Sequence, residues 1–75
     1  MTRLTFNKVD NMMCELNIKT DSNSCKLNEN DAHRLADRIN SEYVDHANLI
    51  LLGDYRALTI RNPKTRKEII TFGVN

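Results

Sequence analysis

The chain has few of the residues that most often signal chemistry or an unusual environment. It contains no tryptophan, one proline, two glycines and two cysteines, and only 5% of its residues are aromatic. Two cysteines are too few for a disulfide framework, which favours a reduced setting inside the cell. No apolar run approaches the roughly 20 residues that span a bilayer, and the N-terminus lacks the apolar segment of a signal peptide. We therefore expect a soluble cytoplasmic protein with no membrane partner.

Motifs of catalysis and metal binding are also missing. There is no GxSxG, no phosphate-binding glycine loop and no HExxH. Cys14, Cys25, His33 and His46 could nominally supply four ligands, but none of them belongs to a CxxC or HxxxH pair. Cys14 lies on the apolar side of a predicted strand and is more simply a small core residue. A Cys14–Cys25 disulfide is allowed by count but not favoured by spacing. We predict no enzyme, no metal, no cofactor and no small-molecule substrate.

Charge is balanced over the whole chain and uneven along it. Seventy-five residues make one domain, residues 1–75. The net charge of +1 argues against an acidic nucleic-acid mimic and against a strongly basic non-specific nucleic-acid binder. Between residues 20 and 45 six acids face three bases, whereas between residues 61 and 68 four bases face one acid. The molecule should therefore be electrically polar from end to end.

The N-terminal third predicts a β-hairpin. Leu4 and Phe6 alternate with polar residues, and Asp10 and Asn11 stand where a turn would lie. The clearest alternation in the chain follows, and a period of two predicts a strand with one buried face, formed here by Met12, Cys14, Leu16 and Ile18. Residues 20–24 are turn-forming and predict a polar loop.

An amphipathic helix is predicted after this loop. Its apolar face repeats at i, i+3, i+4, i+7 and i+11, which gives Ala32, Leu35, Ala36, Ile39 and Tyr43. Asn28 is the predicted N-cap, with Asp31 near the positive end of the helix dipole. Arg34, Arg38 and Ser41 form a stripe on the opposite face that could meet a partner, although a solvated helix face is the simpler interpretation.

Three strands are predicted at the C-terminus. The first, Leu49 to Leu52, is apolar on both faces. Gly53 and Asp54 predict a two-residue hairpin turn of type II′ or I′, which pairs Leu52 with Tyr55. Residues 62–65 predict a type I turn with its proline at the favoured position, and in the last strand Ile70, Phe72 and Val74 share a face.

The predicted order along the chain is β-β-α-β-β-β. One helix packed on one face of an antiparallel sheet is the economical arrangement, a two-layer α+β sandwich. A single narrow helix cannot cover both faces. Ile50, Leu52, Tyr55 and Ala57, joined by Ile69, would then occupy the other face. A contiguous exposed apolar patch typically marks an interaction site. The alternative is that loops or the N-terminal hairpin fold over it.

The second predicted turn carries a basic cluster formed by Arg61, Lys64, Arg66 and Lys67. It could contact nucleic-acid phosphates or an acidic protein surface. The alternative is a solvated hairpin whose charge protects a sheet edge. Base stacking would need exposed aromatic side chains, and the chain has only Phe6, Tyr43, Tyr55 and Phe72.

We therefore expect a small non-catalytic interaction protein. It would bind another protein as a regulator or inhibitor, using the sheet face at Ile50, Leu52 and Tyr55 and the basic hairpin. The first alternative is a nucleic-acid-binding module that uses residues 61–67, and the second is a structural homodimer. Small size, many asparagines and missing catalytic groups give the chain the general style of a phage or mobile-element accessory protein. Such proteins most often bind a host macromolecule and block it.

Overall fold

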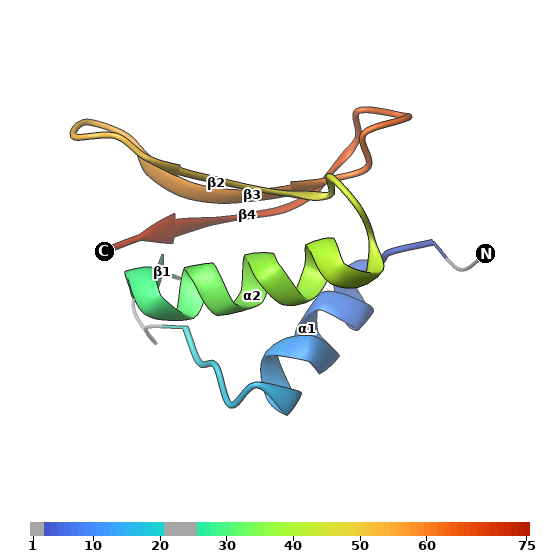
Figure 1. Cartoon of the computed structure of the whole chain (residues 1–75), viewed down its shortest axis with the longest axis horizontal. Helices are drawn as coiled ribbons and strands as arrows, with labels where there is room; N and C mark the ends of the chain where they lie inside the picture. Colours follow the sequence, from blue (N-terminus) through green and yellow to red (C-terminus); the bar gives the residue numbers. More distant parts are fainter. Residues whose placement is uncertain (1–2, 21–25) are drawn as a thin grey trace.

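The computed structural model describes residues 3–20 and 26–75. These residues form two helices and four strands, in the order α1 (Phe6–Glu15), β1 (Lys26–Leu27), α2 (Glu29–Glu42), β2 (Ala47–Leu51), β3 (Arg56–Arg61) and β4 (Glu68–Val74). The strands make one sheet with the spatial order β1-β4-β3-β2, in which β1 runs parallel to β4 and the other neighbours are antiparallel. Both helices lie on the same face of this sheet (Figure 1). The predicted α+β class is confirmed, whereas the purely antiparallel sheet and the single helix are wrong.

The predicted N-terminal hairpin is also wrong, because residues 6–15 form helix α1. Thr5 is its N-cap, with a side-chain oxygen that accepts a hydrogen bond from the Lys8 N–H at 3.3 Å. The helix ends at Glu15, and Asn17, two residues later, has a φ of 56°. The Ile18 N–H then donates to the Met13 carbonyl at 2.8 Å, the bonding pattern of a Schellman motif. Asparagine tolerates this left-handed conformation, which is why the helix stops here.

The alternation of Met12, Cys14, Leu16 and Ile18 runs across the end of α1 and therefore does not mark a strand face. Met12 and Met13 are both buried although they are adjacent, as residues on the broad apolar side of a helix can be. Cys14, predicted to be a core residue, is exposed. Of the predicted polar loop only Thr20 is described, and Cys25 also lies outside the described residues.

Helix α2 follows its prediction closely. The Asn28 side chain caps it by accepting a hydrogen bond from the Asp31 N–H at 2.7 Å. Ala32, Leu35 and Ile39 are fully buried, and Tyr43 packs partly buried against the same core. The apolar side of α2 faces the sheet, and the helix ends at Glu42.

The C-terminal hairpins have the predicted pairing but different turns. Leu52 and Tyr55 exchange two backbone hydrogen bonds, of 3.0 and 3.3 Å, and Ile50 lies opposite Ala57. The predicted type I′ or II′ turn is wrong, because both types need a positive φ at Gly53 and that residue has none. The second turn is longer than predicted, since the Arg66 N–H donates to the Asn62 carbonyl at 2.7 Å, four residues back.

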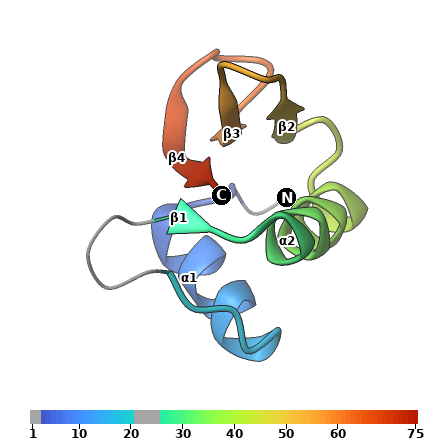
Figure 2. The same cartoon turned by 90° about the vertical axis from the view of Figure 1, so that its left-hand side faces the viewer.

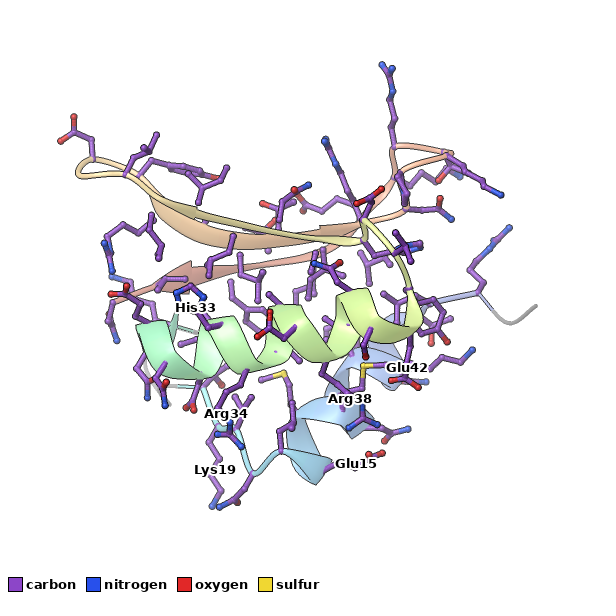
Figure 3. All side chains as sticks on the ribbon, in the orientation of Figure 1. Glu15, Lys19, His33, Arg34, Arg38 and Glu42 are labelled. Carbon is purple, nitrogen blue, oxygen red and sulfur yellow. The ribbon has the colours of Figure 1, made fainter. Side chains whose placement is uncertain are left out.

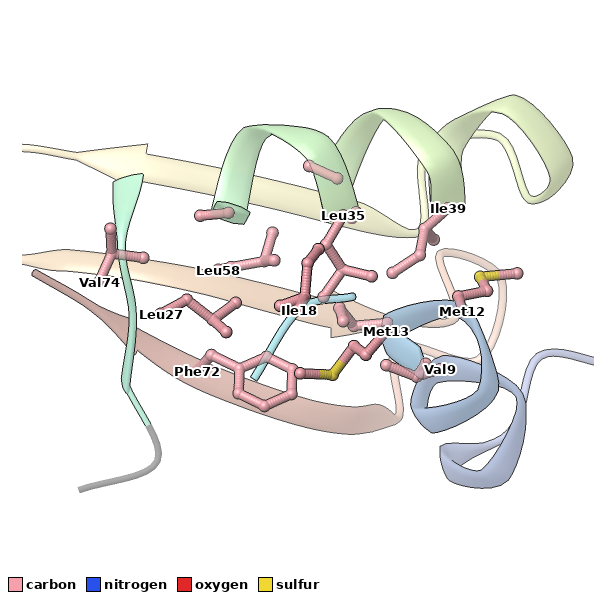
Figure 4. Packing of buried hydrophobic residues seen from close by; sticks show 14 of the residues in the cluster. Val9, Met12, Met13, Ile18, Leu27, Leu35, Ile39, Leu58, Phe72 and Val74 are labelled. Atoms are coloured by element: carbon pink, nitrogen blue, oxygen red, sulfur yellow. The ribbon is translucent and has the colours of Figure 1, made fainter. Parts of the chain in front are cut away.

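The core lies between the sheet and the two helices (Figure 4). β3 and β4 contribute Leu58, Ile60, Phe72 and Val74, and α1 adds Val9 and both methionines of its buried side. Leu27 on the two-residue strand β1 is also fully buried. Neither helix of the described residues is long and apolar enough to cross a membrane.

Candidate protein-binding surface

The sheet has a face that no described element covers. Figures 1 and 2 show both helices on one side of the sheet, and we call the opposite side the outer face. Strand alternation and the β2–β3 register place on it Asn48, Ile50, Leu52, Tyr55, Ala57, Thr59 and Arg61. From Tyr55 to Arg61 this surface extends about 20 Å at roughly 3.3 Å per residue. The prediction that helices cover only one face is therefore confirmed for the part of the chain that the structure describes.

The end of the outer face near the β2–β3 turn is apolar. Leu52 is 64% exposed and Tyr55 is 52% exposed, although both are large apolar side chains. Ile50 beside them is half-buried, and the small Ala57 is buried between Ile50 on β2 and Gly73 on β4. Exposed apolar side chains that adjoin in this way are typical of an interaction surface.

Ile69 does not extend this patch as predicted. It follows the irregular pairing at Arg61 and Glu68 and packs partly buried against the core. The β4 side of the outer face is formed instead by Thr71 and Gly73. The aliphatic stem of Lys26 lies over Gly73, because a Cβ added there would come within 3.2 Å of the Lys26 Cγ. At this edge of the outer face, Lys26 therefore presents an apolar stem to the sheet and a charged ammonium group at its end.

The opposite end of the sheet is basic. Arg61, Lys64, Arg66 and Lys67 are all exposed, and none of them takes part in an ion pair formed by the described residues. A hollow of about 460 Å³ at this end is lined by Asp45, Asn48, Arg61, Pro63 and Arg66. Two guanidinium groups, one amide and the Asp45 carboxylate thus border a concave site next to the outer face, so positive charge exceeds negative charge by one. Such a site fits a carboxylate or phosphate group.

The basic turn is held in one conformation by its own asparagine. The Asn62 side-chain oxygen accepts hydrogen bonds from the N–H groups of Lys64 and Thr65, at 2.9 and 3.4 Å. Arg66 then adopts a φ of 62°, and Asp45 across the hollow has a φ of 63°. Positive φ is uncommon for residues other than glycine and costs free energy. Among residues 3–20 and 26–75, two of the three non-glycine residues with positive φ therefore line the same hollow.

Arg34, Arg38 and Arg56 differ because each has an acidic partner. Arg38 on α2 bonds Glu15 of α1 and Glu42, both at 2.8 Å, and these groups lie together in Figure 3. Its hydrogen bonds to Glu42 and Glu15 raise the pKa of the Arg38 guanidinium above its usual value. Arg34 donates to the Leu16 carbonyl at 2.7 Å, which also ties α2 to the end of α1. The predicted stripe on α2 therefore contacts α1 through both of its arginines.

The seven predicted site residues form two groups at opposite ends of the sheet. Ile50, Leu52 and Tyr55 lie at the apolar end of the outer face, and Arg61 and Arg66 border the hollow at the basic end. Lys64 and Lys67 border two other hollows, each of which also includes Arg3.

Sequence reasoning missed Arg3, Asn48 and Asp45. Asn48 could have been found, since it lies two residues before Ile50 and so shares its face. Nothing in the sequence pattern brings Arg3 or Asp45 to the turn.

Within the described residues, no three histidine, cysteine, aspartate or glutamate side chains gather where they could hold a metal ion. No family model, curated protein or solved structure matches the chain.

Proposed function

We propose that this chain is a non-catalytic interaction protein that binds an acidic surface of another protein, as a regulator or inhibitor of that protein. The observation that carries the proposal is the outer face, which has exposed Leu52 and Tyr55 at one end and a hollow bordered by Arg61 and Arg66 at the other. Neither arginine forms an ion pair with the described residues. Protein interfaces commonly combine an apolar centre with a polar rim, and aromatic residues and arginine are enriched in them.

The two halves of the surface would contribute differently. Burying Leu52 and Tyr55 removes apolar surface from water, at roughly 25 cal/mol per Å², and so slows dissociation. The exposed bases attract an acidic partner over about 8–10 Å at physiological ionic strength, and so speed association. The concave site at Arg61 and Arg66 supplies paired donors for a carboxylate.

The experiment is comparative capture with the full chain from an extract of its source cells. We expect a protein that is retained by the wild type and lost with Tyr55→Asp and with Leu52→Asp. Phe6→Asp is the matched control, because Phe6 is 54% exposed, close to the 52% of Tyr55, and lies on α1 in the helix layer. Loss with the control as well would show general apolar adhesion and contradict the proposal.

Kinetics with the purified partner would then separate the two halves. Arg61→Ala with Arg66→Ala should lower the association rate and weaken its dependence on salt, with a smaller effect on dissociation. Leu52→Ala should raise the dissociation rate, with a loss of affinity of about tenfold if Leu52 is an anchor residue. The reverse assignment would contradict the proposed division.

The nucleic-acid alternative gives a different result in the same assay. Nuclease treatment would abolish capture, and the double arginine variant would abolish binding rather than slow it. Against this alternative, the exposed Tyr55 lies at the end of the outer face away from the basic side chains of residues 61–67. Aromatic side chains are therefore not interleaved with that basic cluster.

A further inference from the structure

Strand β2 is an edge of the sheet that, among the described residues, is protected only at Ala47 by Asn40 and on the helix side by α2. It is the last strand in the order β1-β4-β3-β2. Residues 47–51 include no charge and no proline, and their pairing with β3 has no bulge. The opposite edge of the sheet is protected. There β1 pairs with β4 at Gly73 and Val74, and a bulge interrupts the β3–β4 pairing near Glu68. An uncharged, regular edge strand is a template for pairing with another strand.

The free backbone groups of this edge follow from the alternation of hydrogen-bonded and non-hydrogen-bonded pairs in an antiparallel ladder. Leu52 and Tyr55 exchange both of their backbone bonds, so alternate residues of β2 bond to β3, and the residues between them point away from it. Ala47, Leu49 and Leu51 therefore direct their N–H and C=O groups outward. Leu49 and Leu51 show no hydrogen bond on this side to any of the described residues.

Ala47 is different, because α2 already occupies its outward groups. The Asn40 side-chain amide donates to the Ala47 carbonyl at 3.0 Å, and its oxygen accepts from the Ala47 N–H at 2.9 Å. Asn40 thus imitates a neighbouring strand at the start of β2. Beyond Leu51 the chain turns back toward β3 at Gly53. With respect to the described residues, the edge is therefore free of backbone partners over Leu49, Ile50 and Leu51.

The outward N–H and C=O groups of Leu49 and Leu51 stand at the two ends of a three-residue segment. Such a segment can form hydrogen bonds with a second, antiparallel copy of itself. In an antiparallel arrangement with a two-fold axis at Ile50, Leu49 of one copy exchanges two hydrogen bonds with Leu51 of the other, and Leu51 does the same with Leu49. A two-fold axis at Leu49 would instead set Leu51 against Ala47 and displace Asn40. An axis at Leu51 would need the turn residue Gly53 as a strand partner. The register centred on Ile50 is the one that uses all the free groups and keeps Asn40 in place.

The side chains also match in this register. Leu49 and Leu51, which are half-buried at the edge, would meet each other across the junction on the helix side. On the outer face Ile50 would meet Ile50 of the second copy as a non-hydrogen-bonded pair, with Cα atoms about 4.5 Å apart. Apolar side chains thus face apolar side chains on both sides of the junction, as a strand of this composition requires.

We propose that two copies of this chain associate edge to edge through β2, as an antiparallel pair centred on Ile50 that continues the sheet from one copy into the other. The axis is perpendicular to the sheet, so the two outer faces lie on the same side and form one continuous surface with a basic end at each extreme. This inference is independent of the proposed function, because its test uses the chain alone.

The test is the mass in solution of the full chain and of charge variants at the axis. Sedimentation equilibrium of the wild type should give twice the chain mass of 8.7 kDa. Ile50→Lys and Ile50→Glu should each be monomeric, because like charges would face each other across the axis. An equimolar mixture of the two variants should regain the dimer mass, since lysine then faces glutamate. Thr59→Lys is the matched control, placing the same charge on the outer face of the inner strand β3, and should remain dimeric.

Each other outcome overturns the proposal. A wild type that is monomeric at millimolar concentration removes the dimer, and a dimer that survives Ile50→Lys lies elsewhere on the molecule. A mixture that stays monomeric shows that position 50 does not face itself. Circular dichroism reports whether each variant folds. If Ile50→Lys does not fold, Leu51→Pro replaces it, because that change removes an outward N–H without breaking the ladder to β3 and should also give a monomer.

Discussion

Single residues fix the conformation of the basic turn. Asn62 bonds the backbone at Lys64 and Thr65, and Arg66 takes the left-handed conformation that brings the chain into β4. A glycine would fit that conformation with less strain, by roughly 1–2 kcal/mol before the added flexibility of the unfolded chain is counted. The sequence nevertheless has an arginine there, which borders the hollow beside Arg61. A strained residue at a candidate site favours a role in binding.

Replacing Arg66 with glycine should therefore increase the stability of the fold and decrease its affinity for a partner. We expect Arg66→Gly to raise the free energy of unfolding by roughly 0.5–1 kcal/mol, because strain relief exceeds the entropy cost of glycine. The midpoint of thermal unfolding, measured by circular dichroism, should rise by a few degrees while affinity for an acidic partner falls. Lys64→Gly is the matched control, with the same charge change in the same turn at a residue without positive φ, and should lower the midpoint. A lower midpoint for Arg66→Gly would contradict the strain argument.

At the scale of elements, α2 was predictable and α1 was mistaken for a strand. Both helices have a polar N-cap and apolar residues at helical spacing, as Thr5, Phe6, Val9, Met13 and Leu16 show for α1. The competing period of two ran from Met12 to Ile18, half inside the helix and half beyond its end. The signals that favour a helix were Thr5 as a cap and Asn17 as the residue that ends it.

A proline in the middle of α1 distinguishes the two interpretations. Asn11 would sit in the tight turn of the predicted hairpin, where proline is well tolerated. In the observed helix, Asn11→Pro removes an internal hydrogen bond and clashes with the carbonyl of the residue four positions back, at a cost of about 3 kcal/mol. We expect urea unfolding to show a loss of this size, and Asn11→Ala to be neutral or stabilising. A neutral proline variant would contradict helix α1.

At the scale of the whole molecule, the two faces of the sheet have opposite roles. Leu58 on β3 faces the helices and is fully buried, whereas Leu52 on the outer face is 64% exposed. Four exposed bases that form no ion pair with the described residues, Arg61, Lys64, Arg66 and Lys67, gather at one end of this sheet. The arginines of α2 hold α1. The helix layer stabilises the fold, and the outer face is the surface to which we propose that a partner binds.

A matched pair of leucine substitutions measures this difference. Leu58→Ala should cost about 2–5 kcal/mol of unfolding free energy, because it empties space in a packed core. Leu52→Ala should change it by no more than about 0.5 kcal/mol, since its side chain is mostly in water. Urea unfolding at low protein concentration tests both, so that association does not contribute. A cost above about 2 kcal/mol for Leu52→Ala would show that another part of the chain covers the outer face.

The sequence by itself determined α2 with its Asn28 cap, the pairing of Leu52 with Tyr55 and of Ile50 with Ala57, and an apolar face that one helix could not cover. These features depend on periodicity and turn residues within short segments, and such information is local. Only the tertiary structure decided that α1 joins the helix layer, that β1 pairs in parallel with β4, and that Arg61 and Arg66 share a hollow. It also decided that β2 is an edge capped by Asn40. The physical reason is that each of these depends on contacts between residues distant in sequence.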